Sequence, residues 1–214
     1  MLLNIDKKSA DLEAVNTRFN ADLQRHIDGT LPISHIYQLG YPGDILLSAG
    51  LEYLPIELSA KKLSSKAHVN YRNHHPFDIY EIMDLPKTIN NPIAVFNSTK
   101  NDGVKIILTE FKNRKGNNFV VATKVWGKAL GRKNNKPVNS IVSLYPKDDV
   151  RSLINWINSG NKLVRWMNKE KTLNFVSTQS TNLIASGNSI QGINPILIDY
   201  AKNEIQNFQN PIYP

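Results

Sequence analysis

The segment NNFVVATKVWG, residues 117–127, is rich in β-branched and aromatic residues. Such residues favour β-strands, in which neighbouring side chains point to opposite faces of the sheet. One face of this strand is therefore predicted to carry Val120, Ala122 and Lys124. A lysine inside an otherwise apolar strand is expected to face solvent or a cleft.

The segments around this strand have the same composition and are separated by polar loops. The loop KNRKGNN, residues 112–118, has the length and glycine content of a hairpin connection. The other predicted strands are YLPIELS (53–59), PIAVFNS (92–98), GVKIILTEF (103–111), VNSIVSLYP (138–146), KLVRWM (162–167) and TLNFVS (172–177).

Helical periodicity dominates the first part of the chain. Apolar residues recur at spacings of three and four from Leu12 to Ile27, with Ser9 as the expected N-cap and Gly29 as the expected stop. Shorter helices are predicted in LGYPGDILLSAGL (39–51), in AKKLSSKAH (60–68) and in DIYEIMDLP (78–86). Ser59 is the expected cap of the second of these helices, and the third is expected to end before Pro86. KDDVRSLINWINSG (147–160) is predicted to form an amphipathic helix.

This order of elements predicts an α+β fold, with N-terminal helices packed on a twisted antiparallel sheet that contains one inserted helix. The sequence does not show the strand–helix alternation of a parallel doubly wound sheet.

The positive charge is concentrated in one segment. Residues 100–136 contain ten Lys or Arg and two acidic residues, which gives +8, the net charge of the whole chain. A localised basic surface attracts polyanions, and nucleic acid first among them. The alternative is a set of solvated loop lysines without a specific partner.

Several classes of chemistry are absent from the sequence. The chain has no cysteine, which excludes disulfides, thiolate nucleophiles and cysteine-bound zinc. It contains no glycine-rich phosphate loop, no HExxH and no GxSxG. We therefore expect no cofactor and no metal, and a soluble cytoplasmic protein without a membrane segment. The remaining toolkit of His, Lys, Arg, Ser and Tyr suits metal-independent cleavage of RNA.

The motif HHPFD, residues 74–78, is the main candidate for proton-transfer chemistry, because histidine titrates near neutrality. The alternative is that His75 caps or orients the helix that follows, with Pro76 in its first turn. Ser143 and Tyr145 alternate on one predicted strand and so face the same way.

An ordered series of these segments, over about residues 55–177, resembles the C-terminal domain of phage MuF proteins. HPFDIYEIMDLPKTINNPIAVFNS is similar to the family's His-Pro opening, Leu-Pro step and following strand. KIILTEF and NNFVVATKVWG resemble its central hairpin, NSIVSLYPKDD its Ser-x-Tyr strand, and WINSGNKLVRW its closing helix and strand.

The resemblance implies a fold in the broad barnase, EndoU and RelE-like group, whose members are largely RNA-cleaving toxins or effectors. It implies three regions: an N-terminal helical segment (1–54), the MuF-type domain (55–177) and a polar C-terminal extension (178–214). RNA is then the expected partner, and an immunity or antitoxin protein is a second candidate. The catalytic candidates are His75, His74, Ser143, Tyr145 and Lys124, and the substrate-binding candidates are Lys112, Arg114, Lys115, Arg132 and Lys133.

A second hypothesis keeps this fold and its basic surface without catalysis. The protein would then be a nucleic-acid-binding or protein-docking accessory domain. Affinity for RNA that falls steeply with salt, and that does not depend on His75, would distinguish this function from a ribonuclease.

Overall fold

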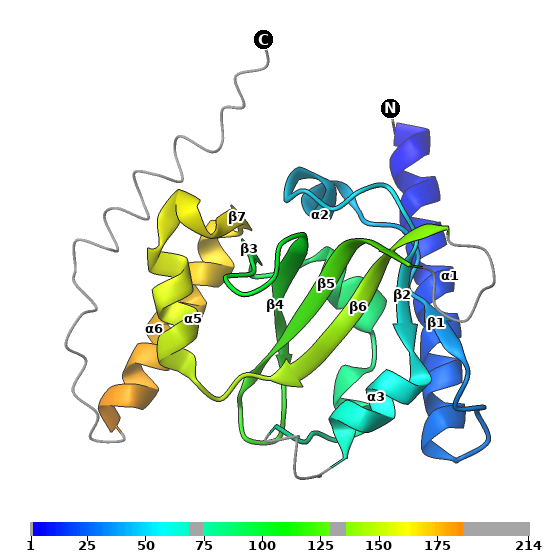
Figure 1. The fold of residues 1–214 in the computed structure, drawn as a ribbon. Helices are drawn as coiled ribbons and strands as arrows, with labels where there is room; N and C mark the ends of the chain where they lie inside the picture. The colour runs from blue at the N-terminus through cyan, green and yellow to red at the C-terminus, as the bar shows by residue number, and fades with distance from the viewer. Residues whose placement is uncertain (1, 69–74, 129–135, 186–214) are drawn as a thin grey trace.

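The computed structural model describes residues 2–68, 75–128 and 136–185, which form an open seven-stranded sheet with helices on both faces (Figure 1). The strand order is β1-β2-β6-β5-β4-β3-β7. The strands are β1 (Ile36–Gln38), β2 (Ile56–Ser59), β3 (Ala94–Asn97), β4 (Val104–Lys112), β5 (Asn118–Lys128), β6 (Pro137–Pro146) and β7 (Val164–Met167).

The helices are α1 (Leu2–Ile27), α2 (Asp44–Ser48), α3 (Ala60–Ala67), α4 (Leu85–Asn90), α5 (Val150–Asn158) and α6 (Lys169–Ala185), with 3-10 turns η1 (Ile79–Ile82) and η2 (Gly160–Lys162). The predicted α+β class is confirmed. Neighbouring strands pair antiparallel, except β2 and β6, which run parallel. In the part of the chain that the structure describes, no helix has both the length and the apolar character needed to cross a membrane.

The alternation in β5 divides the core into two layers, as the sequence predicts. Val121 is buried in the larger cluster, with residues of α1, α3 and α4, whereas Val120 is buried in the smaller cluster, with residues of α5 and α6. Figure 1 shows α5 and α6 together at one side of the sheet, while β5 and β6 cross the front with no helix drawn before them. This uncovered part of the sheet is on the face to which the side chain of Val120 points.

The N-terminal helix packs on the same core as the central strands. Phe19 and Leu23 of α1 are buried in the cluster that also contains Val121. The side chains of Asn16 and Asn20 donate hydrogen bonds to Asp84 Oδ1, just before α4. The core is therefore continuous across residue 54, where the sequence suggested the end of an N-terminal segment.

Side-chain caps fix several helix starts. Ser59 caps α3, as predicted, by accepting a hydrogen bond from the backbone N–H of Lys62. Asp78 caps η1 in a reciprocal capping box with Glu81, and Asp149 caps α5 through the backbone N–H of Ser152. Because Asp78 is the cap of η1, His75 is not needed for that role.

Three local predictions are wrong. α1 begins at Leu2, so Ser9 lies inside the helix and is not its N-cap. The two helical turns predicted over 78–86 are a single 3-10 turn, η1, which does end before Pro86, but Pro86 lies in the first turn of a second helix, α4. Proline is tolerated there because it removes no intrahelical hydrogen bond. TLNFVS (172–177) is part of α6, not a strand.

In residues 172–177, tertiary packing overrides the local preference for a strand. Phe175 is 6% exposed and packs in the smaller cluster, a contact that a helical conformation provides. α6 continues to Ala185, across the expected start of the C-terminal extension at residue 178.

Candidate functional site

The uncovered face of the sheet carries three of the predicted catalytic residues. In the β5–β6 register, Ala122 is opposite Ser143 and Val120 is opposite Tyr145. Lys124 follows Ala122 on the same face and is exposed. The alternation of β5 and β6 therefore brings Lys124, Ser143 and Tyr145 to one surface.

His75 joins this surface through Tyr145. The two rings are stacked, with their centroids 5.4 Å apart and an interplanar angle of 25°. Phe77, two residues after His75, anchors this segment in the core. Its side chain is buried, and its ring meets the ring of Phe119 edge-on, with the centroids 5.1 Å apart. The sequence HPF thus anchors a partly exposed imidazole by a buried phenylalanine two residues later.

Asp148 completes this group, and the sequence analysis missed it. Its Oδ2 lies 3.2 Å from His75 Nδ1, and the two side chains are 57% and 33% exposed. A carboxylate on Nδ1 fixes the orientation and the tautomer of an imidazole. The available signal was the acidic pair Asp148–Asp149 directly after the Ser-x-Tyr strand, but sequence alone gives no reason to pair it with a residue 73 positions earlier.

The phenol of Tyr145 is kept protonated by its surroundings. Burial raises the pKa of Tyr145, and the negative charge of Asp148 raises it further. Since the ordinary value is already 10.0, the hydroxyl stays protonated at neutral pH and can donate a hydrogen bond.

The other two strand residues lie at increasing distances from His75. Ser143 is two residues from Tyr145, or about 7 Å at the usual rise of a strand. Lys124 is opposite Ser140 and four residues from Val120, the partner of Tyr145, which is roughly 13 Å along the strand. Lys124 is therefore on the same face of the sheet as Tyr145, but farther along the strands.

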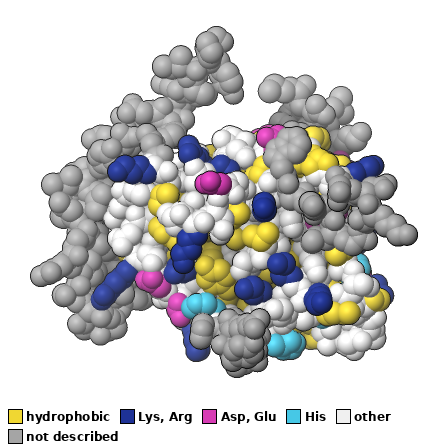
Figure 2. Space-filling model, in the orientation of Figure 1, with side chains coloured by type: hydrophobic (Ala, Val, Ile, Leu, Met, Phe, Trp, Pro, Cys, Tyr) yellow, Lys and Arg dark blue, Asp and Glu magenta, His cyan; other side chains and the backbone are white. Residues whose placement is uncertain are grey.

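The described basic residues of the predicted binding set lie around the β4–β5 hairpin. Lys112, Arg114 and Lys115 are all exposed. Arg114 also makes an ion pair with Asp78 at 2.9 Å, which ties the hairpin to the start of η1. Figure 2 shows Lys and Arg side chains spread over the face that β5 and β6 cross. Three predicted residues, His74, Arg132 and Lys133, lie outside the described residues.

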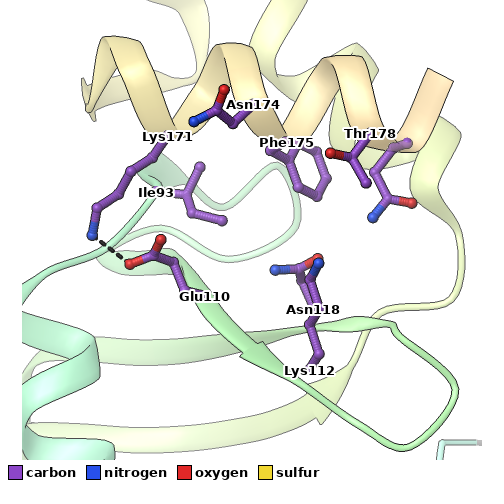
Figure 3. A pocket seen from close by; sticks show the side chains of 9 residues that line it. Ile93, Glu110, Lys112, Asn118, Lys171, Asn174, Phe175 and Thr178 are labelled. Atoms are coloured by element: carbon purple, nitrogen blue, oxygen red, sulfur yellow. Dashed lines mark hydrogen bonds and ion pairs between the residues drawn. The ribbon is translucent and has the colours of Figure 1, made fainter. Parts of the chain in front are cut away.

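A cavity of about 220 Å³ opens between α6 and the β4–β5 hairpin (Figure 3). Lys171 of α6 and Glu110 of β4 form an ion pair at one end of it. The sequence analysis did not find this cavity, because half of its wall comes from α6, where TLNFVS was predicted to be a strand. Its lining residues are Ile93, Glu110, Lys112, Asn118, Lys171, Asn174, Phe175, Thr178 and Gln179.

A second histidine group lies at the junction of α1, β1 and α3. His26 Nδ1 is 2.7 Å from the hydroxyl of Tyr37, and its Nε2 is 2.8 Å from Ser64 Oγ. His35 Nε2 lies 3.2 Å from Asp22 Oδ2. Both nitrogens of His26 are thus engaged in joining three elements. Within residues 2–68, 75–128 and 136–185, no three His, Asp or Glu side chains gather as a metal-ligand set.

One comparison with known proteins found a match, to a protein family. The family model described as the phage MuF C-terminal domain matches residues 66–174, just over half of the 214-residue chain. This range contains β3 to β7 and, with them, His75, Tyr145 and Asp148. No curated protein and no solved structure matches the chain. The chain belongs to the phage MuF C-terminal domain family.

Proposed function

We propose that the protein is a ribonuclease that cleaves RNA by general acid–base catalysis at His75. The observation that carries this proposal is the position of His75, which is stacked on Tyr145, held by Asp148 and partly exposed beside a face with many cations. Such an arrangement positions one titratable ring next to a surface that attracts a polyanion.

The proposed reaction needs no group beyond the RNA and the side chains. A base removes the proton of a ribose 2′-OH, and the resulting oxygen attacks the adjacent phosphorus. The bond from phosphorus to the 5′ oxygen of the next nucleotide breaks, and an acid protonates that oxygen. The products are a 2′,3′-cyclic phosphate and a free 5′-OH. His75 is the proposed base or acid of this sequence.

Asp148 acts as a positioning residue in this proposal. When His75 Nδ1 donates its hydrogen to Asp148 Oδ2, Nε2 becomes the nitrogen that exchanges a proton with the substrate. The carboxylate also stabilises the imidazolium that forms after proton abstraction.

Tyr145 and Ser143 are proposed to contact the reacting phosphate. The phenol of Tyr145 remains a donor because burial and Asp148 raise its pKa, and such donors stabilise the charge that develops on the phosphorane oxygens. Lys124 lies roughly 13 Å along the strand from this point. We therefore assign Lys124, with Arg114, Lys115, Arg132 and Lys133, to the binding of flanking phosphates, and Lys112 to the binding of RNA at the cavity beside the β4–β5 hairpin.

The biological setting that fits this activity is an effector or toxin domain of a phage or another mobile element, acting on cytoplasmic RNA. Family membership supports the phage origin, and the RNA-cleaving group that the sequence resembles supports the chemistry. A cell that makes such a domain needs protection, so an immunity or antitoxin protein is the proposed protein partner.

The test is cleavage of a defined RNA by the full chain in EDTA, with detection of the 2′,3′-cyclic phosphate end. His75→Ala is expected to lower the rate by about 100-fold or more. His35→Ala is the matched control, because it removes another His–Asp pair of the same 3.2 Å separation from the α1–β1 junction.

Two results would count against the proposal: no cleavage by a folded wild-type chain, or equal activity of His75→Ala. Binding of RNA that weakens steeply with salt, without any cleavage, would instead support the accessory-domain function.

A further inference from the structure

The cavity beneath α6 contains a buried hydrogen-bond acceptor. Asn118 is 2% exposed, and its Nδ2 donates to the backbone carbonyl of Thr109 at 2.9 Å. Since a carbonyl oxygen only accepts, this bond fixes which end of the amide is which. Asn118 Oδ1 is then the free end, and it is buried without a hydrogen-bond partner among the described residues.

Such an acceptor is unusual because buried polar groups are normally hydrogen-bonded. Asn118 also lines the cavity, and Figure 3 shows its side chain rising from β5 toward α6. A ligand in this cavity that presents an N–H group would satisfy the unpaired Oδ1.

A cation lies beside this acceptor. Lys112 is directly opposite Asn118 in the β4–β5 register, is exposed, and lines the same cavity. The wall therefore offers an acceptor next to a donor. A complementary edge has an exocyclic amino group beside an unprotonated ring nitrogen, as in cytosine and adenine. Uracil also has a donor, its ring N3–H, but this group lies between two carbonyls and projects less far toward a recessed acceptor than an exocyclic amino group does. Uracil presents a carbonyl where cytosine presents the amino group.

The size and the remaining walls suit a single base. The cavity measures about 220 Å³, below the roughly 300–1,000 Å³ of sites that take drug-sized ligands. Ile93 and Phe175, both buried, supply apolar surface for the faces of a ring. Proteins that read single-stranded RNA hold splayed bases by this combination of apolar contact and edge hydrogen bonds.

The backbone of Asn118 links the cavity to the residues that contact His75. The backbone carbonyl of Asn118 accepts a hydrogen bond from the N–H of Lys147 at 2.8 Å, and Lys147 precedes Asp148. Asn118 is also two residues from Val120, the strand partner of Tyr145, or about 7 Å.

We propose that this cavity is a base subsite, which binds a cytosine or adenine of the RNA next to the linkage that is cleaved. The inference rests on the proposed function in one respect, that RNA is the ligand of this face. Because Oδ1 is itself buried, the base must displace wall side chains to reach it. The exposed side chains of the wall are those of Glu110, Lys112, Asn174 and Thr178.

The test is an NMR titration of the full chain with cytidine 3′-monophosphate and with uridine 3′-monophosphate, which differ only in the base. The side-chain amide signals of Asn118 are expected to shift with the cytidine nucleotide, and its affinity is expected to be about tenfold higher, as for one good base contact. Lys112→Met should reduce this ratio to near one, whereas Lys61→Met, an exposed lysine of α3 that does not line the cavity, should leave it unchanged.

Asn118→Leu is the second variant, and circular dichroism checks its fold because the change also removes the bond to Thr109. Equal affinity of the two nucleotides, or shifts confined to residues around His75, would overturn the base subsite. This outcome is separate from the proposed catalysis: RNA cleavage with equal affinities refutes only the subsite, and selective nucleotide binding without cleavage refutes only the ribonuclease.

Discussion

Replacing Asp84 with alanine is expected to lower the free energy of unfolding by about 3 kcal/mol, because Asp84 joins α1 to α4 and has an unusual backbone conformation. The amides of Asn16 and Asn20 both donate to its Oδ1, and these bonds lower the pKa of its carboxyl group. Its φ of 63° and ψ of 21° lie in the left-handed region.

The magnitude follows from two contributions. Asn16 is 2% exposed, so its Nδ2 loses its acceptor without access to water, which costs about 1–3 kcal/mol. Asn20 is more exposed, and water replaces its bond at little cost. Alanine in the left-handed region adds roughly 1–2 kcal/mol, a penalty that aspartate partly avoids.

Glycine at the same position separates these contributions. Asp84→Gly loses the same hydrogen bonds but has no steric penalty in the left-handed region. It is therefore expected to be more stable than Asp84→Ala by about 1 kcal/mol, the reverse of the usual order within a helix. Asp84→Asn keeps an acceptor and tolerates the conformation, so it should be the mildest of the three.

Urea unfolding followed by circular dichroism measures these differences. With a slope of about 2–3 kcal/mol per molar urea, the midpoint of Asp84→Ala should fall by roughly 1 M. A single transition is expected, because Asn16 in α1 and Asp84 in the family-matched region belong to one core. A midpoint equal to that of the wild type, or a glycine variant less stable than the alanine variant, would refute this reasoning.

Two further predictions concern the helices around the sheet. Burial, and then the charges of His68 and His35, lower the pKa of His26 from 6.5, so the unfolded chain binds its proton more readily than the folded one. The contribution of His26 to stability should be full above pH 6.5 and should decrease as the pH falls through the lowered pKa of His26 in the folded chain. The urea midpoints of wild type and His26→Gln, measured from pH 7.5 to 5, should therefore converge. A difference that stays constant with pH would contradict this. Asp149→Ala removes the N-cap of α5 and should cost about 1 kcal/mol, whereas Asp148→Ala, next to the cap, should have a smaller effect on unfolding.

The parts of the fold that were predictable from sequence are those with a clear period. The two-residue period of β5 placed Val120, Ala122 and Lys124 on one face, and the structure confirms it. The amphipathic helix predicted over 147–160 was also found, as α5, and its Leu153 and Ile157 are buried. In these elements local pattern and tertiary burial agree.

The predictions failed for features that depend on contacts between segments far apart in the sequence. TLNFVS is short and contains β-branched and aromatic residues, and its packing through Phe175 on the sheet favours a helix. The same error hid the cavity, because Thr178 and Gln179 contribute to it only as part of α6. Asp148 could not be paired with His75 because the contact joins segments 73 residues apart.

The central claim is that the imidazole of His75 transfers a proton during RNA cleavage. Addition of free imidazole to His75→Ala tests it most directly, since a small base can enter the space left by the missing ring. Imidazole is expected to raise the cleavage rate of His75→Ala by at least about tenfold, with a pH dependence that follows the imidazole, and His35→Ala is expected not to respond. Wild-type activity in His75→Ala without imidazole would contradict it.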